Sequence, residues 1–178
     1  KYHATRNGDA AAEFFKDSNV GTYINVDGYA GYNKLKSFKR CACYAHIRRY
    51  FVEAIPKDKE KDFTNPAVQG MMYCNKLFEY ERSYKEKNLS YKQKQNRRLK
   101  DEKPVVEAFL SWLNKQNPAK GSRFDRAITY ALNQKEYMMT YLEDSHCSIS
   151  NNLSENSIRP LTLGRKNWLF CDTTDGAE

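Results

Sequence analysis

Two acidic residues, far apart in the chain, stand in local sequences that can present a carboxylate to a metal ion. Asp27 follows the β-forming run TYINV and precedes Gly28, so we expect it at the carboxyl end of a strand. Glu155 lies in NNLSENSIRP, where Pro160 removes a backbone donor and should end a helix after little more than one turn. Strand ends and short helices are rigid mounts, and carboxylate oxygens suit hard cations such as Mg²⁺.

The residues around Glu155 allow two interpretations. With Asn152 as the N-cap of a helix, Glu155 would take the third helical position, where the carboxylate of a capping box binds the backbone. However, a helix this short and polar is a poor core element. We therefore favour the interpretation that it positions Glu155, together with Asn152, toward a bound group. Positive charge would come from three residues nearby: Arg159, Arg165 and Lys166.

The segment CACYAHIRRYF places Cys43 and His46 at C-x-x-H spacing, where a strand should give way to a helix. Zinc would need two further ligands, and no second pair with this spacing follows. One alternative is a buried cysteine and a hydrogen-bonded histidine that join the strand to the helix. A third is a role beside a substrate, with His46 and the adjacent Arg48 and Arg49 directed at DNA.

A strongly basic stretch at residues 84–103 separates two predicted helices. Charge runs of this kind usually form a solvated surface. The alternative is a surface that follows DNA phosphates, with Arg97 and Arg98 among its contacts and with Tyr84 and Tyr91 available for stacking on bases.

The composition favours a polyanionic partner. The 178 residues carry a formal net charge of +8, and the pI of 9.2 makes nucleic acid the first candidate. Five cysteines, an odd number in a lysine-rich chain, do not indicate a secreted disulfide framework, so a reducing cytoplasm is the simplest setting. No run approaches the roughly 18 apolar residues of a membrane span. Because the sequence begins with Lys1, we expect a piece of a larger protein.

The elements that must position these residues alternate between helix and strand near the start of the chain. We expect a short helix at 10–15, a strand at 22–26, a second strand in FKRCACYA and a helix from about residue 45, where Ile47, Phe51 and Ile55 recur every four residues. Three helical stripes follow, at 67–78, 105–113 and 128–142. These patterns predict an α/β fold interrupted by an all-helical segment, either as an insertion or as a separate helical lobe.

Four motifs occur in a fixed order: DGYAGYNKL, CYAHIRRYF, SRFDRAITYALNQ and ISNNLSENSIRPLTLGRKNWLF. With these motifs the chain resembles, over essentially its whole length, the transposases of the insertion sequence 66 family of bacterial mobile elements. The resemblance implies an RNase H-like catalytic domain, similar to that of retroviral integrases, with a large helical insertion between the last two members of an Asp, Asp, Glu triad. The expected division is an RNase H-like portion at 1–61, the helical insertion at 62–143 and a second RNase H-like portion at 144–178.

By this resemblance Asp27 is the second carboxylate of the triad and Glu155 the third, so the two should lie close together and bind two Mg²⁺ or Mn²⁺ ions. Ions about 3.5–4 Å apart suit an in-line displacement at phosphorus, in which water or a 3′-hydroxyl attacks. Asn152, Cys43 and His46 are candidates for supporting these ligands. The candidate DNA contacts are Arg48, Arg49, Arg97, Arg98, Arg159, Arg165 and Lys166.

The first Asp of the triad is expected on a strand upstream of Lys1, so the first strands of the fold and one ligand would be missing from this sequence, which alone should be inactive. In the parent protein we expect metal-dependent cleavage and strand transfer of element ends. The expected partners are double-stranded DNA, at element ends and target, and further copies of the protein. The protein is expected in the bacterial cytoplasm, associated with the nucleoid. Two other classes remain open: a non-catalytic DNA-binding or assembly fragment of a decayed transposase, and an RNase H-like nuclease.

Overall fold

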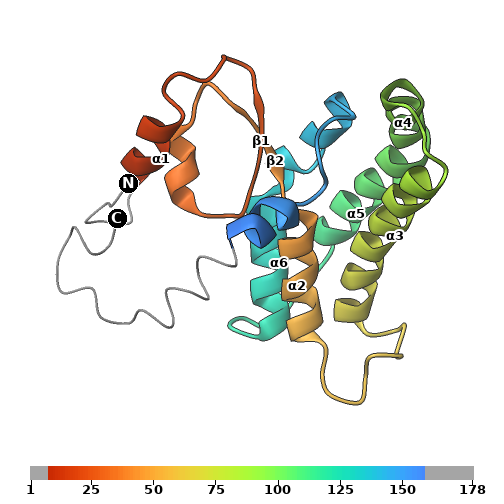
Figure 1. Ribbon diagram of the computed structural model, residues 1–178. Helices are drawn as coiled ribbons and strands as arrows, with labels where there is room; N and C mark the ends of the chain where they lie inside the picture. The colour runs from red at the N-terminus through yellow and green to blue at the C-terminus, as the bar shows by residue number, and fades with distance from the viewer. Residues whose placement is uncertain (1–7, 159–178) are drawn as a thin grey trace.

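The computed structural model describes residues 8–158, a helix-rich arrangement with a small parallel sheet (Figure 1). The N-terminal part consists of α1 (Gly8–Phe14), β1 (Tyr23–Val26), the 3₁₀ helix η1 (Ala30–Lys34), β2 (Lys39–Ala42) and α2 (Tyr44–Ala54). The helical part consists of α3 (Pro66–Glu86), α4 (Tyr91–Arg97), the π-helical turn η2 (Arg98–Glu102), α5 (Lys103–Asn114), α6 (Arg123–Asn133) and the 3₁₀ helices η3 (Lys135–Tyr137) and η4 (Thr140–Glu143). A last short helix follows at 152–158.

The two strands bring two distant motifs to one edge of a sheet. β1 and β2 pair in parallel, with Val26 opposite Ala42. In a parallel pair the carboxyl ends of both strands meet at the same edge. Asp27 therefore leaves β1, and Cys43 leaves β2, side by side at that edge. The prediction that Asp27 follows a strand is confirmed.

Helix α2 is the element on which the helical part packs. Its buried residues are Tyr44, His46, Ile47 and Phe51, and α3 and α6 lie against it on either side (Figure 1). α3 comes so close that a Cβ atom on Gly70 would lie 2.4 Å from the Phe51 ring. A larger residue at position 70 would push α3 away from α2, so the close packing requires glycine there.

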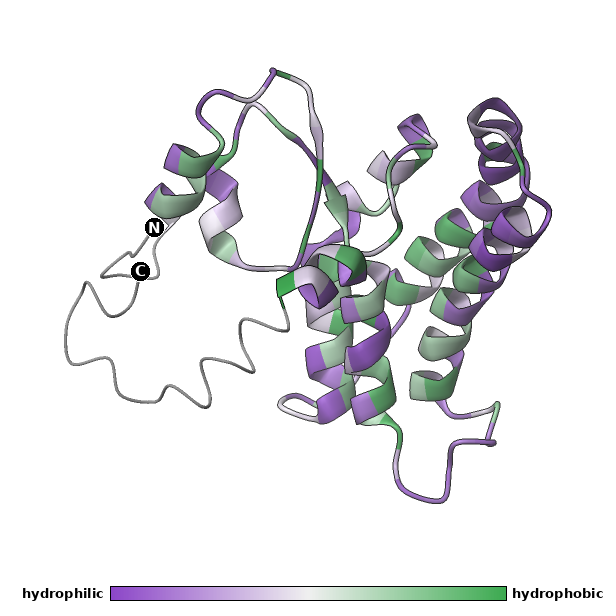
Figure 2. Ribbon diagram, in the orientation of Figure 1, coloured by the Kyte–Doolittle hydropathy of each residue, from purple (hydrophilic) through white to green (hydrophobic). Residues whose placement is uncertain are grey.

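One hydrophobic core joins the helical part to the strands. Its members come from β2, α2, α3, α5 and α6 and include Cys41, Phe51, Leu77, Phe109 and Ile128. Figure 2 shows green, hydrophobic residues where these helices face one another, whereas α4 is mostly hydrophilic. The helical part therefore packs as one body with β2 and α2, and the division of the chain into an RNase H-like domain and an insertion stays a prediction. The exact borders at residues 61 and 143 stay predictions.

The three predicted helical stripes correspond to α3, α5 and the stretch from α6 to η4, and no strand interrupts residues 62–143. The third stripe differs from the prediction because the α-helix ends at Asn133, and Met139 and Leu142 belong to the region of η4. Side chains three residues apart line up in a 3₁₀ helix, so these two residues give the same apolar spacing as an α-helix. Among the helices of residues 8–158, none combines the length and apolar character needed to cross a bilayer.

Within the basic stretch at 84–103, the fold buries one cation completely. Arg98, in the π-helical turn, is entirely shielded from solvent. Its Nε donates to Glu81 Oε1 at 2.7 Å. Its other two nitrogens donate to the carbonyl oxygens of Tyr141 at 3.0 Å, Asp144 at 3.1 Å and Cys147 at 2.7 Å. The guanidinium group thereby ties α3 and η2 to the segment 141–147.

The charge of Arg98 is balanced inside the protein. Burial raises the pKa of Glu81, but hydrogen bonds and charge from Arg98 and Lys94 outweigh burial and leave the pKa of this carboxyl below its ordinary value. Lys94 Nζ lies 2.8 Å from Glu81 Oε2. Glu81 therefore stays ionised between two cations, and the buried guanidinium has the partner that it needs.

Two predictions for the basic stretch are wrong. Arg98 cannot contact DNA phosphates, because its three guanidinium nitrogens are buried and already bound. Tyr84 cannot stack on bases, because it is only 2% exposed and its hydroxyl donates to Asp101 at 3.3 Å. Arg97 stays half exposed, with its Nε 2.9 Å from Asp101, and its DNA contact stays a prediction.

Replacing Arg98 by Met should lower the free energy of unfolding by about 3–5 kcal/mol, because Glu81 and three carbonyl groups lose their common donor in the interior. Arg97→Met is the matched control: its ion pair is half exposed, and such pairs contribute about 0–1 kcal/mol. Urea denaturation measures both variants. A loss below about 1 kcal/mol for Arg98→Met would contradict its structural role.

Candidate active site

Asp27 is held in place by the turn that follows it. Its Oδ1 accepts a hydrogen bond from the Tyr29 backbone N–H at 3.1 Å, in the manner of an Asx turn. The Gly28 N–H donates to the Tyr130 hydroxyl of α6 at 3.1 Å. A Cβ atom on Gly28 would lie only 2.7 Å from the Tyr130 ring. Glycine at this position therefore lets the turn pack directly on α6 and fixes the direction in which Asp27 leaves β1.

Residues 144–151, which we call the strap, run from η4 to the last helix. Asn25 Nδ2 in β1 donates to the Ser148 carbonyl oxygen at 2.7 Å. The Tyr44 N–H, at the start of α2, donates to the Ile149 carbonyl oxygen at 2.9 Å. These bonds hold the strap against the carboxyl ends of both strands, while Arg98 holds its other end to the helical part.

The end of the strap is bound to Cys43. The Cys43 thiol donates to Asn151 Oδ1 at 2.9 Å, and the Asn151 N–H donates to Cys43 Sγ at 3.4 Å. Thiol hydrogen bonds are weak, but two of them between the same residues fix the position of Asn151. The strap therefore delivers the last helix to the edge of the sheet at which Asp27 lies.

The last helix begins one residue earlier than the sequence predicted. Residues 152–158 are helical, and the Glu155 N–H closes the first turn by donating to the Asn151 carbonyl oxygen at 3.0 Å. Glu155 is therefore the fourth helical residue, and the capping box predicted with Asn152 as N-cap is wrong. Because the carboxylate does not serve the helix end, it is available for another contact.

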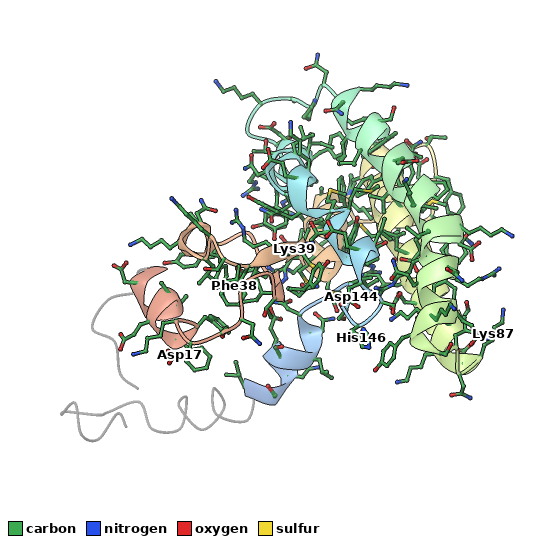
Figure 3. The ribbon with its side chains drawn as sticks, turned by 90° about the horizontal axis from the view of Figure 1, so that it is seen from above. Asp17, Phe38, Lys39, Lys87, Asp144 and His146 are labelled. Carbon is green, nitrogen blue, oxygen red and sulfur yellow. The ribbon has the colours of Figure 1, made fainter. Side chains whose placement is uncertain are left out.

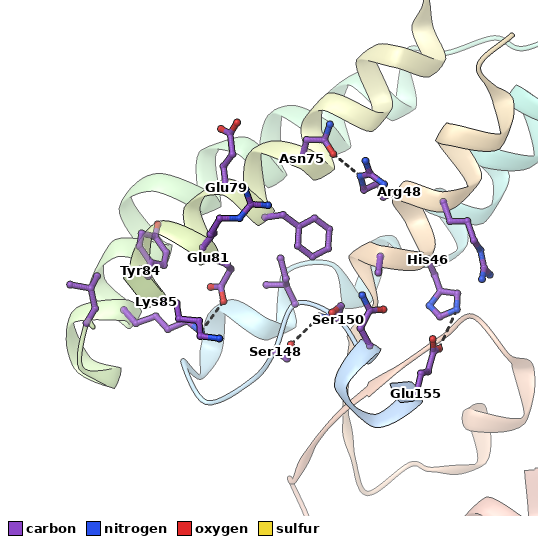
Figure 4. A pocket seen from close by; sticks show the side chains of 18 of the residues that line it. His46, Arg48, Asn75, Glu79, Glu81, Tyr84, Lys85, Ser148, Ser150 and Glu155 are labelled. Atoms are coloured by element: carbon purple, nitrogen blue, oxygen red, sulfur yellow. Dashed lines mark hydrogen bonds and ion pairs between the residues drawn. The ribbon is translucent and has the colours of Figure 1, made fainter. Parts of the chain in front are cut away.

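That contact is with His46. Glu155 Oε1 lies 3.4 Å from His46 Nε2, and Figure 4 shows the two side chains facing each other across the end of a pocket. The His46 side chain is 10% exposed and that of Glu155 is 46% exposed. His46 Nδ1 is buried without a hydrogen-bond partner among the described residues. The histidine thus contacts Glu155 from the protein side and leaves about half of the glutamate accessible to a ligand.

Asp27 and Glu155 have a common neighbour in Cys43. Burial raises the pKa of the Cys43 thiol, and the negative charge of Glu155 adds to this effect. Burial also raises the pKa of Tyr130 to about 12, with smaller contributions from the charges of Asp27 and Cys43. Asp27 and Cys43 directly follow the paired residues Val26 and Ala42, so the strand register places them next to each other. Cys43 therefore links the sheet edge at which β1 ends to the helix that carries Glu155.

The donor set at this edge suits part of a magnesium site. Asp27 and Glu155 supply carboxylate oxygens, and Mg²⁺ is commonly bound by one or two carboxylates together with water and substrate phosphates. Within residues 8–158, no three His, Cys, Asp or Glu side chains lie close enough to hold a metal ion together. That finding gives no support to zinc at Cys43 and His46, and a complete two-metal site would need a further ligand from elsewhere in the protein.

An open cleft of about 1250 Å³ leads away from Glu155 (Figure 4). α2 and α3 form its sides, the strap and the last helix contribute Ser148, Ile149 and Asn152, and α4 lies at its far end. Arg48 Nε donates to Asn75 Oδ1 at 2.6 Å and joins the two sides. The basic residues that line the cleft are Arg48, Arg49, Arg82, Lys85 and Lys94.

The acidic residues of the cleft are largely neutralised. Glu79 Oε2 lies 3.0 Å from Lys76 Nζ, and Glu81 is bound by Arg98 and Lys94. Apart from these, Glu155 is the carboxylate that lines the cleft. The cleft therefore presents a predominantly cationic surface that ends at one of the two proposed metal ligands.

The structure brings some of the sequence-predicted site residues together and leaves others apart. Arg48, Arg49, His46 and Asn152 line the cleft that contains Glu155. Arg97 and Arg98 are not among the residues that line this cleft, and Arg98 is buried. Four residues to which the sequence gave a role lie outside the described residues: Arg159, Pro160, Arg165 and Lys166.

Sequence reasoning missed Tyr130, Asn151 and Arg82, and it included Lys85 only as part of the basic stretch at 84–103. The signal for Arg82 and Lys85 is their three-residue spacing on α3, which puts both on one helix face. Tyr130 and Asn151 have no comparable signal. Their roles depend on contacts with Gly28 and Cys43, which lie 102 and 108 residues away in the sequence.

Comparison with known proteins gives one family and a small set of relatives. The profile of the family described as "Transposase IS66 family" matches residues 1–178. "Uncharacterized protein y4hP" of Sinorhizobium fredii (strain NBRC 101917 / NGR234) is 29% identical over 146 residues, which cover 76% of this chain and 26% of that protein. "Uncharacterized protein y4qI" of the same organism is 27% identical over 164 residues, covering 86% of this chain and 30% of that protein. No solved structure matches the chain.

The chain spans about a quarter to a third of the length of these curated relatives.

The adjacent asparagines allow a test of how the last helix is anchored. Asn151→Ala should speed hydrogen exchange of the Glu155 amide about fivefold to tenfold, because losing the Cys43 contact costs about 1 kcal/mol and a helix of this length is marginal by itself. Asn152→Ala, one residue along, should change that rate less than about twofold, since Asn152 is not bound to Cys43. A larger effect at Asn152 than at Asn151 would restore the N-cap that the sequence predicted.

Proposed function

The chain belongs to the Transposase IS66 family, and on that basis we propose that it supplies part of the catalytic site of a bacterial DNA transposase. The proposed reaction is metal-dependent cleavage of element ends and their transfer to target DNA. Asp27 and Glu155 are the proposed metal ligands, as the second and third carboxylates of an Asp, Asp, Glu triad.

The observation that carries this proposal is the meeting of two distant motifs at one sheet edge. Asp27 follows β1, Cys43 follows the paired strand β2, and Cys43 binds the asparagine from which the Glu155 helix starts. Three separate sets of contacts, from Asn25, Tyr44 and Cys43, hold the strap in this position. An arrangement built from residues so far apart supports a shared function for the two carboxylates.

The same arrangement supports an RNase H-like fold for the parent protein. Two parallel strands, a helix after the second strand and a helical segment that returns to the sheet edge are compatible with that fold. In the proposal, residues 1–61 and 144–178 belong to the RNase H-like domain and residues 62–143 are inserted into it. Further strands would come from parts of the protein outside residues 8–158.

The first carboxylate of the triad is proposed to lie on one of those further strands. Asp27 and Glu155 alone leave the donor set incomplete, because residues 8–158 hold no three ligating side chains together. Mg²⁺ or Mn²⁺ would be held by the complete triad as a pair of ions. When bound, such ions supply charge neutralisation at the reacting phosphate and activation of the attacking oxygen.

The residues of this chain would bind and orient rather than attack. His46 and the Cys43–Asn151 contact hold the Glu155 carboxylate at the sheet edge, and Tyr130 holds the turn after Asp27. Arg48, Arg49, Arg82 and Lys85 would bind backbone phosphates along the cleft. The attacking group is a water molecule or a DNA 3′-hydroxyl, so no nucleophilic side chain is required.

The proposed partners are double-stranded DNA, at element ends and target, and further copies of the protein assembled on that DNA in the bacterial nucleoid. A non-catalytic DNA-binding or assembly fragment of a decayed transposase would share the basic cleft, and an RNase H-like nuclease would share the carboxylates. Strand transfer distinguishes the proposed function from both.

In the full-length protein, Asp27→Asn and Glu155→Gln should each reduce cleavage of a labelled element end by more than about 100-fold, because each removes a charged oxygen ligand at the reacting phosphate. Affinity for the same DNA should change little. Glu107→Gln on α5, an exposed carboxylate near Lys103, is the control and should cleave normally. Cleavage that survives Glu155→Gln would place the active site elsewhere. A fully active enzyme that only nicks DNA and never joins it would favour the nuclease.

Two double variants of equal charge test the cleft. Arg82→Gln with Lys85→Gln should weaken duplex DNA binding and flatten the dependence of log affinity on log salt by about one unit for each lost phosphate contact. Lys115→Gln with Lys120→Gln removes the same charge from exposed positions after α5, outside the cleft, and should have a smaller effect. Salt titrations by fluorescence anisotropy measure both. Equal slopes for the two variants would mean that net charge, not the cleft, accounts for binding.

A further inference from the structure

Two exposed aromatic rings are stacked at the α4 end of the cleft. Tyr91, the first residue of α4, and His146, on the strap, have ring centroids 3.8 Å apart with 29° between their planes. Tyr91 is 60% exposed and the His146 side chain is 63% exposed. Aromatic side chains usually bury their faces in a core. This pair instead leaves a large part of its ring surface open to solvent.

The position of His146 is fixed by hydrogen bonds to Asp144. Asp144 Oδ1 lies 2.8 Å from His146 Nδ1 and also accepts the His146 backbone N–H at 2.8 Å. These two hydrogen bonds lower the pKa of Asp144, and Figure 3 shows Asp144 and His146 close together on the strap. The Asp144 carbonyl oxygen is in turn held by the buried Arg98 at 3.1 Å.

The tyrosine is fixed by the start of its helix. Ser90 and Gln93 form a complete capping box around the first turn of α4, so the backbone of Tyr91 is ordered before any ligand binds. Both rings are thus held by their own segments. Stacking a planar ligand on a ring that is already fixed loses little conformational entropy.

The surroundings of Tyr91 favour one kind of planar ligand. Tyr91 lines the cleft together with Leu89 and the cations Lys85 and Lys94. Lys94 is three residues after Tyr91 on α4, so both occupy one face of that helix. An exposed aromatic ring beside cations in a groove is the combination with which proteins bind single-stranded nucleic acid, because phosphates meet the cations and bases stack on the ring.

We propose that Tyr91, supported by His146, stacks on an unpaired base of the DNA strand that occupies the cleft. The proposal rests on the function proposed above and adds that the bound DNA is unpaired at this point of the cleft. In a duplex both faces of each interior base are covered by neighbouring bases, so the ring can stack only on a base that is unpaired or at a strand end. Lys85 and Arg82 would bind the phosphates next to that base.

The probe for this site is a single-stranded oligonucleotide with 2-aminopurine placed at successive positions, since the fluorescence of 2-aminopurine falls when it stacks. In the full-length protein without divalent metal, at least one position should lose fluorescence on binding. The loss should persist in Tyr91→Phe, which keeps the ring, and disappear in Tyr91→Leu, which keeps apolar volume without it. Fluorescence that is the same for the wild type and Tyr91→Leu at every position would overturn the proposal.

Affinity provides the second readout. Tyr91→Leu should weaken binding of the single strand about fivefold to a hundredfold, the range found for the loss of one base-stacking ring, and weaken binding of a blunt duplex of the same sequence less than about twofold. Tyr80→Leu removes a ring of α3 that stacks on Tyr84 and is the control. Equal losses for single strand and duplex, or no loss for either, would show that the ring only joins α4 to the strap.

The outcome is separate from that of the proposed function. Loss of cleavage in Asp27→Asn or Glu155→Gln concerns the proposed metal site, away from the α4 end of the cleft where Tyr91 lies, and leaves stacking intact. If stacking fails while those variants lose cleavage, the active site stands and the base site falls. If stacking is found but neither Asp27→Asn nor Glu155→Gln affects cleavage, the base-stacking site stands and the proposed active site falls.

Discussion

The buried guanidinium of Arg98 is the interaction on which the arrangement of the helical part and the strap depends. It collects the carboxylate of Glu81 and the carbonyl oxygens of Tyr141, Asp144 and Cys147 into one hydrogen-bonded cluster. A cation in this position is stable only with all of its partners, since an unpaired buried charge is very costly. The helical part is therefore not free to move against the strap, and the strap carries Glu155 to the strands.

From this constraint the site and the cleft follow as one structure. The strap that Arg98 fixes is bound further along by Asn25, Tyr44 and Cys43, so its two ends link the α4 region to the sheet edge. At the sheet edge, His46 contacts Glu155. At the α4 end, Tyr91 and His146 are stacked. A chain that the family profile matches throughout thus joins the strand before Asp27, the helix that carries Glu155 and a basic cleft into one bonded arrangement.

Local patterns predicted the elements well because they act over a few residues. Alternating β-formers before Asp27 marked β1, and the four-residue spacing of Ile47 and Phe51 marked α2. The failures are residues whose state depends on distant partners. Arg98 looks like any exposed cation in a charge run, and only Glu81 and the strap carbonyls bury it. The start of the last helix moved by one residue because Cys43 binds Asn151 rather than Asn152. Divalent metal, DNA and the RNase H-like domain remain predictions drawn from the family.

The central claim is that Asp27 and Glu155 hold the same metal ions, and cleavage of the protein by bound iron tests it most directly. Fe²⁺ replaces Mg²⁺ in the full-length protein, and ascorbate with hydrogen peroxide then generates radicals that cut the backbone beside the ion. A shared site should give two groups of cuts, around residue 27 and around residue 155, that disappear together when excess Mg²⁺ competes. Cuts around only one of these residues, or cuts that excess Mg²⁺ does not suppress, would contradict a shared site.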